Sequence, residues 1–472
     1  MSARPNLSRR RFLQVASAAG LLATIPRRAT ATAPTTPPLP ATGKARNLIF
    51  MVADGMSAGS FTLACRHLER TTGRPSLWAG LIANDRDAHC GLMDTASADS
   101  LVTDSAAGSS SWGGGRRVKN GCINIAPDGS AVEPVLVKAR RAGKSIGLVT
   151  TATVTHATPA GFLANVDQRG REEEIATQYL ARGIDVCLGG GRDFFTPTSR
   201  SDHRDLAGEF AAAGYTLLHD RAALLAATTA QNRLLGLFWG DHLPFRVDHR
   251  AEPALDARVP SLAEMTTAAL ARLAQNPSGF ALQVEGARVD MAAHNNDAAA
   301  LLGEMLDFDA ALAVVLDFQR EHADTLVVIT TDHGTANPGL NGDVDDEAAL
   351  ARLAGIGESF DRMAPALRPG MSAEELQARF AAGTGLPITA AEMTPVREYL
   401  GKLNPSDYAP GKTMKSALGA VLTKHLAIGW TGTAHTADFV IFTAKGPGAA
   451  AFPSLVRNDA VHGHLLAALN IA

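Results

Sequence analysis

The stretch Val102-Thr103-Asp104-Ser105-Ala106-Ala107 joins a strand-forming pair of residues to the start of a helix. Asp104 can cap the first helical turn, and the small alanines let that turn form without obstruction. Ser105 would then stand at a helix N-terminus, where free backbone N–H groups and the helix dipole stabilise an oxyanion. An isolated T-D-S-A is usually only a helix cap. With supporting residues elsewhere, it predicts a nucleophilic hydroxyl beside an anion site.

Polar residues follow several apolar runs of strand length. Three such runs, at 47–52, 279–284 and 325–331, lead to Asp54, Glu285, Asp332 and His333. Apolar runs that do not alternate with polar residues are typical of parallel strands covered on both faces. Open parallel sheets bind their ligands at the carboxyl ends of the strands. We therefore expect these side chains to meet at one edge of a sheet.

Helical patterns alternate with these strands, at 133–142, 262–273 and 301–318. This alternation predicts an α/β fold: a doubly wound, mostly parallel sheet with helices on both faces. The rhythm breaks at about 341–424, where two capping boxes indicate a small helical insertion.

Three local expectations complete this prediction of the fold. The helix after Ser105 is rich in glycine and serine, so it should be short or loosely held. Residues 156–159 are expected to form a loop, because a residue before proline favours extended backbone. The sheet should resume with residues 430–436 and 439–443.

Residues 1–33 have the order of a secretory signal, with a basic start and a short apolar run at 15–25. The paired Arg9 and Arg10 resemble the twin-arginine type. The apolar run is too short for a stable membrane anchor. We therefore expect export by the twin-arginine machinery, to the periplasm or outside the cell.

Composition excludes some classes of protein. The 472 residues are 46% hydrophobic, enough for a large globular core, which we expect at 45–472 after a linker at 34–44. Without the six arginines of residues 1–33, 38 basic residues face 47 acidic ones, a net charge near −9. This argues against a nucleic acid polymer as partner. Four separate cysteines leave disulfide pairing open: Cys65, Cys90, Cys122 and Cys187.

More potential ligands stand between these elements. Asp290 and His294 are four residues apart and can share one helix face. Thr158 and Arg169 follow the strand expected at 145–151, and His435 lies near the C-terminus. Each residue alone has an ordinary structural explanation, as a cap, a turn residue or a satisfied histidine. Many carboxylates and imidazoles on one rim would repel one another unless cations bind between them.

The same residues lie in blocks that resemble the alkaline phosphatase family, in family order, from residue 45 to the C-terminus apart from the insertion. The matching blocks are Val52-Ala-Asp-Gly-Met56, Thr103-Asp-Ser-Ala-Ala107 with Trp112 and Asn120-Gly121, Thr155-His-Ala-Thr-Pro-Ala160, Leu282-Gln-Val-Glu-Gly-Ala287 with Asp290 and His294, Thr331-Asp-His333, and His435-Thr436.

This resemblance implies an alkaline phosphatase that hydrolyses phosphate monoesters through a phosphoserine at Ser105, with two zinc ions. The first zinc would be held by Asp54, Asp332 and His333, and the second by Asp290, His294 and His435. Arg169 matches the arginine that grips phosphate oxygens through its planar fork.

The resemblance also implies a third metal site, usually magnesium, at Asp54, Thr158 and Glu285. This chain departs from the best-known bacterial pattern there, because His156 stands in place of an acid. An imidazole ligand favours zinc or cobalt over magnesium, so the third metal is left open.

Rival activities share parts of this pattern. A phosphodiesterase or sulfatase of the same superfamily would keep the two-metal core, but Thr158, Glu285 and Arg169 argue for small phosphate monoesters. A phosphate-binding protein without catalytic activity would not need Ser105 among zinc ligands. A homodimer remains open.

Overall fold

The computed structural model describes residues 44–227, 233–342, 346–403 and 412–472. The signal expected at 1–33, and the linker up to residue 43, lie outside the described residues. Among the helices that are described, none combines the length and the apolar character needed to span a bilayer.

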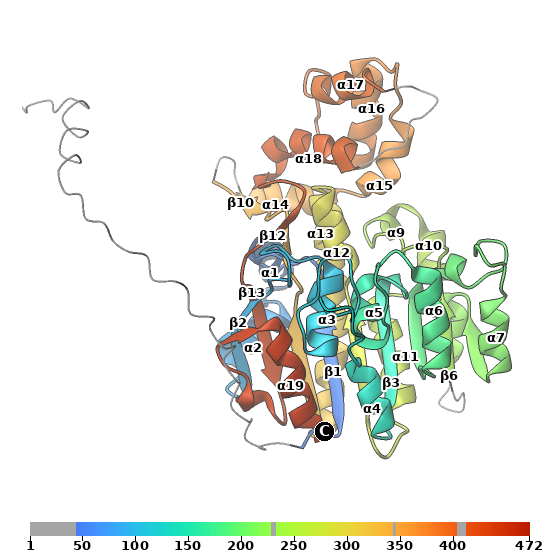
Figure 1. Ribbon diagram of the computed structural model, residues 1–472. Helices are drawn as coiled ribbons and strands as arrows, with labels where there is room; N and C mark the ends of the chain where they lie inside the picture. Colours follow the sequence, from blue (N-terminus) through green and yellow to red (C-terminus); the bar gives the residue numbers. More distant parts are fainter. Residues whose placement is uncertain (1–43, 228–232, 343–345, 404–411) are drawn as a thin grey trace, which may run out of the picture. The chain divides into compact units, whose positions relative to one another are not determined.

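A ten-stranded sheet runs through the fold in the order β14-β2-β13-β8-β1-β7-β3-β4-β6-β5 (Figure 1). Its strands are β1 (Asn47–Val52), β2 (Ala88–Asp94), β3 (Ser145–Thr153), β4 (Val186–Gly190), β5 (Tyr215–Leu218), β6 (Arg233–Leu237), β7 (Phe280–Glu285), β8 (Thr325–Thr330), β13 (Val440–Lys445) and β14 (Leu455–Arg457). Neighbouring strands are parallel except where β13 pairs antiparallel with β2 and β8. The predicted α/β fold with a mostly parallel sheet is confirmed.

β1 lies in the middle of the sheet, and all six of its residues are buried. Its alternate side chains enter two different cores: Ile49 and Met51 face one, and Leu48, Phe50 and Val52 the other. A central parallel strand must be apolar on both faces, which explains its unbroken apolar run.

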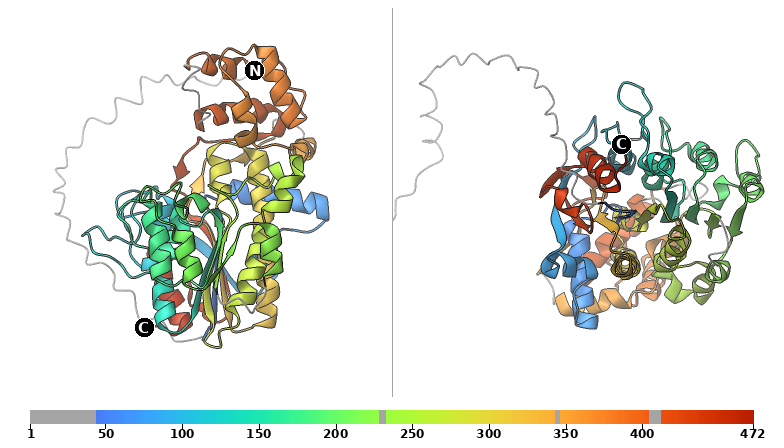
Figure 2. Two further views of the ribbon diagram at one scale, coloured as in Figure 1. Left: turned by 90° about the vertical axis from the view of Figure 1, so that its right-hand side faces the viewer. Right: turned by 90° about the horizontal axis from the view of Figure 1, so that it is seen from below.

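Helices cover both faces of the sheet (Figure 2). One face carries α3 (Ser105–Gly114), α4 (Val135–Arg141), α5 (Ala157–Leu163), α6 (Glu172–Ala181), α7 (Leu206–Ala212) and α19 (Asn458–Leu469). The other carries α1 (Ala58–Thr72), α2 (Leu77–Asn84), α8 (Arg221–Ala226), α11 (Leu262–Leu273), α12 (Arg288–His294) and α13 (Ala298–Glu321), with the short α10 (Pro253–Arg258) beside α8 and α9 (Asp248–Ala251) beside α10.

Helices also fill the stretch between two short strands, β10 (Gly339–Leu340) and β11 (Ile428–Gly429), which pair with each other. These helices are α14 (Asp346–Gly355), α15 (Phe360–Met363), α16 (Ala373–Thr384), α17 (Thr394–Leu400) and α18 (Lys412–Leu426). Their apolar side chains, among them Leu353, Phe360 and Phe380, continue the core that contains α13. We call residues 346–426 the helical insertion.

Three local expectations were wrong. Residues 156–159 are not a loop, because α5 begins at Ala157 with His156 as its N-cap. Pro159 lies in the first turn of α5, where a helix needs no N–H donor. Residues 430–436 do not join the large sheet. Instead β12 (His435–Thr436) pairs with β9 (Gly334–Thr335) in a separate two-stranded sheet.

The third wrong expectation concerned α3, whose ten residues are all buried. Glycine and serine are needed there because α3 packs very closely on α5. A Cβ atom on Gly113 would lie 1.9 Å from the carbonyl oxygen of Gly161. The Ser109 hydroxyl also donates to the carbonyl of Thr158 at 2.5 Å. Tertiary packing therefore overrides the weak helix propensity of this sequence.

Candidate active site

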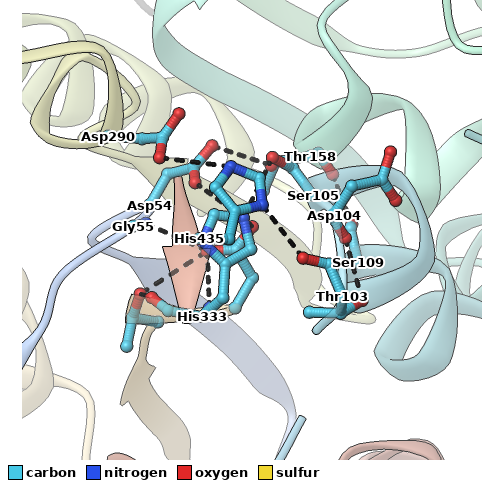
Figure 3. A network of polar contacts seen from close by, with 12 residues as sticks. Asp54, Gly55, Thr103, Asp104, Ser105, Ser109, Thr158, Asp290, His333 and His435 are labelled. Atoms are coloured by element: carbon cyan, nitrogen blue, oxygen red, sulfur yellow. Dashed lines mark hydrogen bonds and ion pairs between the residues drawn. The ribbon is translucent and has the colours of Figure 1, made fainter. Parts of the chain in front are cut away.

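Ser105 is the first residue of α3, and its N-cap is Asp104 (Figure 3). The Oδ1 atom of Asp104 accepts the backbone N–H of Ala107 at 2.9 Å, which closes the first turn. The hydroxyl oxygen of Ser105 lies 3.4 Å from Nε2 of His333. The predicted serine therefore stands at a helix N-terminus, beside a histidine that comes from 228 residues further along the chain.

Four neighbouring strands of the large sheet bring the predicted ligands together. In sheet order these strands are β8, β1, β7 and β3. At or beyond their carboxyl ends lie Asp332 and His333, Asp54, Glu285, and His156 with Thr158. All of these except His156 are fully buried. The sheet thus gathers residues that are up to 279 positions apart in the sequence.

The two-stranded sheet of β9 and β12 adds His435 from near the C-terminus. Its ring stacks on that of His333, with centroids 3.6 Å apart. The Nδ1–H of His435 donates to the carbonyl of Thr103 at 2.9 Å. In the same way the Nδ1–H of His294 donates to the carbonyl of Thr433 at 2.6 Å. Neutral imidazoles held in this way leave Nε2 unprotonated.

The Nε2 atoms of His294 and His435 lie only 2.9 Å apart. Oδ2 of Asp290 lies 3.3 Å from the His294 nitrogen, and Oδ1 lies 3.6 Å from the His435 nitrogen. With both nitrogens unprotonated, their lone pairs and the carboxylate would repel one another at these distances. A shared cation would remove that repulsion.

Potential metal ligands form three overlapping groups, each with ligand atoms within 4.8 Å of one another. The groups are Asp54, Asp332 and His333; Asp290, His333 and His435; and Asp54, His156 and Glu285. Thr158 lies beside the last group, and its hydroxyl donates to Oδ2 of Asp54 at 3.3 Å. Every residue predicted as a metal ligand therefore lies in this one place.

Several ligand atoms are buried without any hydrogen-bond partner. They are Oδ1 of Asp54, Oε1 of Glu285, Oδ2 of Asp332 and Nδ1 of His156. An unpaired buried carboxylate oxygen is costly. Burial, followed by the charge of Asp332, raises the pKa of Asp54 well above its ordinary value, and burial raises that of Glu285 to about 8. Bound cations would satisfy the carboxylate oxygens and stabilise their negative charge, so these residues fit metal ions.

Arg169 lies beside the third ligand group and is held in place on both sides. Its Nη1 donates to Oδ2 of Asp104 at 3.1 Å, and its Nη2 donates to Nε2 of His156 at 3.0 Å. The same oxygen of Asp104 accepts the N–H of Gly121 at 2.9 Å. The guanidinium is therefore oriented before any ligand arrives.

A cavity with a volume of about 520 Å³ opens over these groups. Its lining residues include Ser105, Asn120, Arg169, Asp290, His294 and His435. A hydroxyl, a guanidinium and a set of potential metal ligands thus face one small space, which suits a compact oxyanion.

A sequence model described as alkaline phosphatase matches residues 45–471, which is most of the chain. The chain belongs to the alkaline phosphatases. Alkaline phosphatase 4 of Bacillus subtilis (strain 168) is 33% identical over 423 residues, covering 88% of this chain and 86% of the relative. Streptomycin-6-phosphate phosphatase of Streptomyces griseus is 32% identical over 465 residues, covering 87% and 97%.

Solved structures agree with this family assignment. The alkaline phosphatase of Thermus thermophilus has a TM-score of 0.85 at 34% identity, covering 95% of this chain and 96% of that one. A cold-active alkaline phosphatase from Shewanella sp. has a TM-score of 0.75 at 30% identity, covering 90% and 99%.

Alkaline phosphatases are metal-dependent phosphomonoester hydrolases that act on small phosphate monoesters. This alkaline phosphatase is therefore an enzyme of that class, as the sequence predicted. Its three groups of potential ligands are consistent with the metal dependence of the family.

Some residues around the site were not predicted. The Thr335 hydroxyl donates to Oδ1 of Asp290 at 2.6 Å, and the ring of His242 stands edge-on to that of His156 with centroids 5.7 Å apart. Glu172 accepts the hydroxyls of Thr153 and Thr155, which precede His156. One signal could have found His242: it lies shortly after a buried strand, β6, as the predicted ligands do.

Proposed function

We propose that this alkaline phosphatase hydrolyses phosphate monoesters through a phosphoserine at Ser105. The observation that carries the proposal is the position of the Ser105 hydroxyl, at a helix N-terminus and 3.4 Å from His333 in the first ligand group. A serine that served only as part of a helix cap would not need this neighbour. The oriented fork of Arg169 supports the same reading.

Three sets of residues would hold the metal ions. Asp54, Asp332 and His333 would bind one zinc, and His333 also lies in the group of Asp290 and His435. Asp290 and His435 would bind a second zinc together with His294, whose Nε2 lies 2.9 Å from that of His435. Asp54, Thr158 and Glu285 would form a third site, for which magnesium, zinc and cobalt remain open because His156 adjoins it. Bound metal ions would supply positive charge that lowers the pKa of an attacking hydroxyl and stabilises the transferring phosphoryl group.

The chain's own residues account for the remaining steps. Arg169 grips two oxygens of the phosphate, and the N-terminal N–H groups of α3 face the same anion. The Ser105 hydroxyl gives its proton to water and its oxygen forms a bond to phosphorus, the bond from phosphorus to the alcohol oxygen breaks, and the alcohol leaves with a proton from water. A water oxygen then attacks phosphorus and loses a proton to solvent, and the Ser105 oxygen leaves and takes up a proton to restore the hydroxyl.

The test combines a variant with a comparison of substrates. Wild-type enzyme quenched in acid during turnover of a radiolabelled aryl phosphate monoester should carry label on Ser105. Ser105→Ala should carry none, and its turnover should fall by roughly three orders of magnitude or more. Its zinc content should stay unchanged, because the metal ligands remain. Labelled Ser105→Ala protein would contradict the proposal.

Diester hydrolysis distinguishes the rival activities. The wild-type enzyme should hydrolyse an aryl phosphate monoester far faster than the matching diester or sulfate ester, because Arg169 is placed to contact two free phosphate oxygens. A preference for the diester or the sulfate would overturn the assignment of substrate, whatever the state of Ser105.

We further propose export by the twin-arginine route, to the periplasm or beyond the cell. The support is the order of charges and apolar residues in 1–33. Arg9→Lys combined with Arg10→Lys should retain phosphatase activity in the cytoplasm. Normal export of that double variant would exclude the twin-arginine route.

A further inference from the structure

One carboxylate of the helical insertion, Asp361 on α15, contacts both ends of α12. Its Oδ2 accepts a hydrogen bond from the guanidinium of Arg288 at 2.9 Å. Its Oδ1 accepts from the side-chain amide of Asn295 at 3.2 Å and from the ammonium of Lys415 at 2.6 Å. Arg288 is the first residue of α12, and Asn295 is its C-cap.

Asp290 and His294 lie on α12 between these two contacts. This helix has only seven residues, so its own hydrogen bonds fix it weakly. Anything that holds both of its ends therefore holds the carboxylate and the imidazole that it carries.

The position of Asp361 is itself fixed by the two residues before it. The N–H and hydroxyl of Ser359 donate to the carboxylate of Asp248 at 2.7 and 2.8 Å. The N–H of Phe360 donates to Oδ2 of Asp297 at 2.6 Å. Asp248 and Asp297 belong to the main fold, at α9 and at the N-cap of α13. These hydrogen bonds anchor the backbone next to Asp361 to the main fold.

Arg288 is equally constrained on the other side of the contact. Its guanidinium carbon lies 3.6 Å above the centre of the Phe245 ring, and only 9% of its side chain is exposed. A guanidinium clamped between a ring and a carboxylate has little freedom to move.

We propose that Asp361 is a positioning residue for the metal site formed by Asp290, His294 and His435, and that the helical insertion serves the site through it. This inference rests on the proposed function, because it takes those residues to be metal ligands. Residues that orient metal ligands typically change metal affinity or activity by about 10- to 100-fold when they are replaced. Asp361 would act on the metal only through α12.

The test compares Asp361→Asn with a matched control, Glu358→Gln. Both substitutions remove a partly buried carboxylate of the insertion, with exposed side-chain fractions of 32% and 21%. Glu358 pairs with Arg362 and Arg379, which also belong to the insertion, at 3.6 and 2.7 Å. The control therefore loses a comparable charge network without a contact to α12.

Three measurements are made on the full-length variants. Zinc affinity is measured by competition with a chromophoric chelator. Hydrogen exchange of the peptide covering residues 288–295 is followed in the metal-free protein. Activity is measured at limiting and at excess zinc. We expect Asp361→Asn to bind its weakest zinc about 10- to 100-fold less tightly than wild type, to exchange faster in that peptide, and to recover activity in excess zinc.

Glu358→Gln should match wild type in zinc affinity and in the exchange of that peptide, even where its unfolding midpoint falls. Equal values for Asp361→Asn and Glu358→Gln would overturn the inference. If Asp361→Asn fails to fold, Lys415→Met removes one donor and should give a smaller change in the same direction. A wild-type protein that binds no zinc would contradict the proposed function instead, while faster exchange in Asp361→Asn would still support the contact with α12.

Discussion

Asp104 contacts the turn of Ser105, the proposed nucleophile, and the side chain of Arg169 with different oxygens. Its Oδ1 closes the turn that carries Ser105, and its Oδ2 accepts from Arg169 and from the N–H of Gly121. A carboxylate shared in this way sets the distance between the hydroxyl and the guanidinium. In the proposed mechanism both groups contact the same phosphate, so this shared contact would prepare the site before substrate binds.

The substitution Arg169→Lys tests whether the planar guanidinium group of Arg169 is needed to bind phosphate. A lysine has one ammonium and cannot contact Asp104, His156 and two phosphate oxygens in a fixed geometry. We expect kcat/KM for an aryl phosphate to fall by roughly 10- to 100-fold, and inhibition by inorganic phosphate to weaken by about tenfold.

Arg171→Lys is the matched control for this prediction. Arg171 lies two residues further along the chain, is half exposed, and pairs with Asp167 and Glu174. It does not line the site cavity. Its replacement should leave both constants unchanged. If Arg169→Lys did the same, the fork would have no part in binding phosphate.

Among the secondary-structure elements, α3 and α5 illustrate how close packing replaces helix propensity. The Cβ that Gly113→Ala adds would collide with the Gly161 carbonyl, so the two helices must separate. We expect this variant to lose about 1 to 3 kcal/mol in free energy of unfolding, and to lose activity because Ser105 lies on α3. Urea unfolding measures the loss.

Gly463→Ala on α19 provides the comparison. A Cβ at Gly463 would meet no atom within 4 Å, so alanine should there raise the free energy of unfolding by up to about 1 kcal/mol. Equal effects of the two substitutions would show that helix propensity, and not the contact with α5, decides the role of Gly113.

The elements that the sequence predicted well are those with a strong local signal. The mainly apolar runs of β1, β7 and β8 favour buried strands, and the polar residues after them followed from the general rule for parallel sheets. The family resemblance supplied the remaining site residues. The start of α5 and the pairing of β12 were missed. A segment with a proline and a short polar segment can each adopt several backbone conformations, and tertiary contacts select among them.

His242 carried only the weak signal of its place after β6, and its contact with His156 is visible only in the fold. Asp361 could not be predicted for a related reason. It follows an ordinary local pattern, and its importance comes from neighbours such as Arg288 that are distant in the sequence. A single sequence carries no signal for such a meeting. The geometry of the fold has to be known first.

For the whole molecule, buried carboxyl groups make stability depend on pH. Burial raises the pKa of Glu304 on α13 to about 7, from an ordinary value of 4.5. Between these two pH values the folded protein keeps a proton that the unfolded chain has lost. The stability that this proton provides is complete below pH 4.5 and is lost as the pH rises to about 7.

Glu304→Gln should therefore flatten the decline of stability over this range. Glutamine keeps an oxygen to accept the N–H of Arg246, which Glu304 accepts at 2.8 Å, and it does not titrate. We expect the fall in free energy of unfolding between pH 4.5 and pH 7 to be smaller than in wild type by about 3 kcal/mol. Urea unfolding at several pH values measures it. The exposed Glu69, which pairs with Arg66, is the control position, and a slope for Glu304→Gln equal to that of Glu69→Gln would contradict the assignment.

The order of strands in the sheet also governs when the protein can fold during its synthesis. β2 is made early, yet it pairs with β13 and β14, which are made some 350 residues later. His435 enters the site just before β13. A growing chain must therefore carry an unpaired strand for most of its translation, and such strands invite aggregation. A chain released before β12 is made would therefore lack both the complete sheet and the proposed ligand His435.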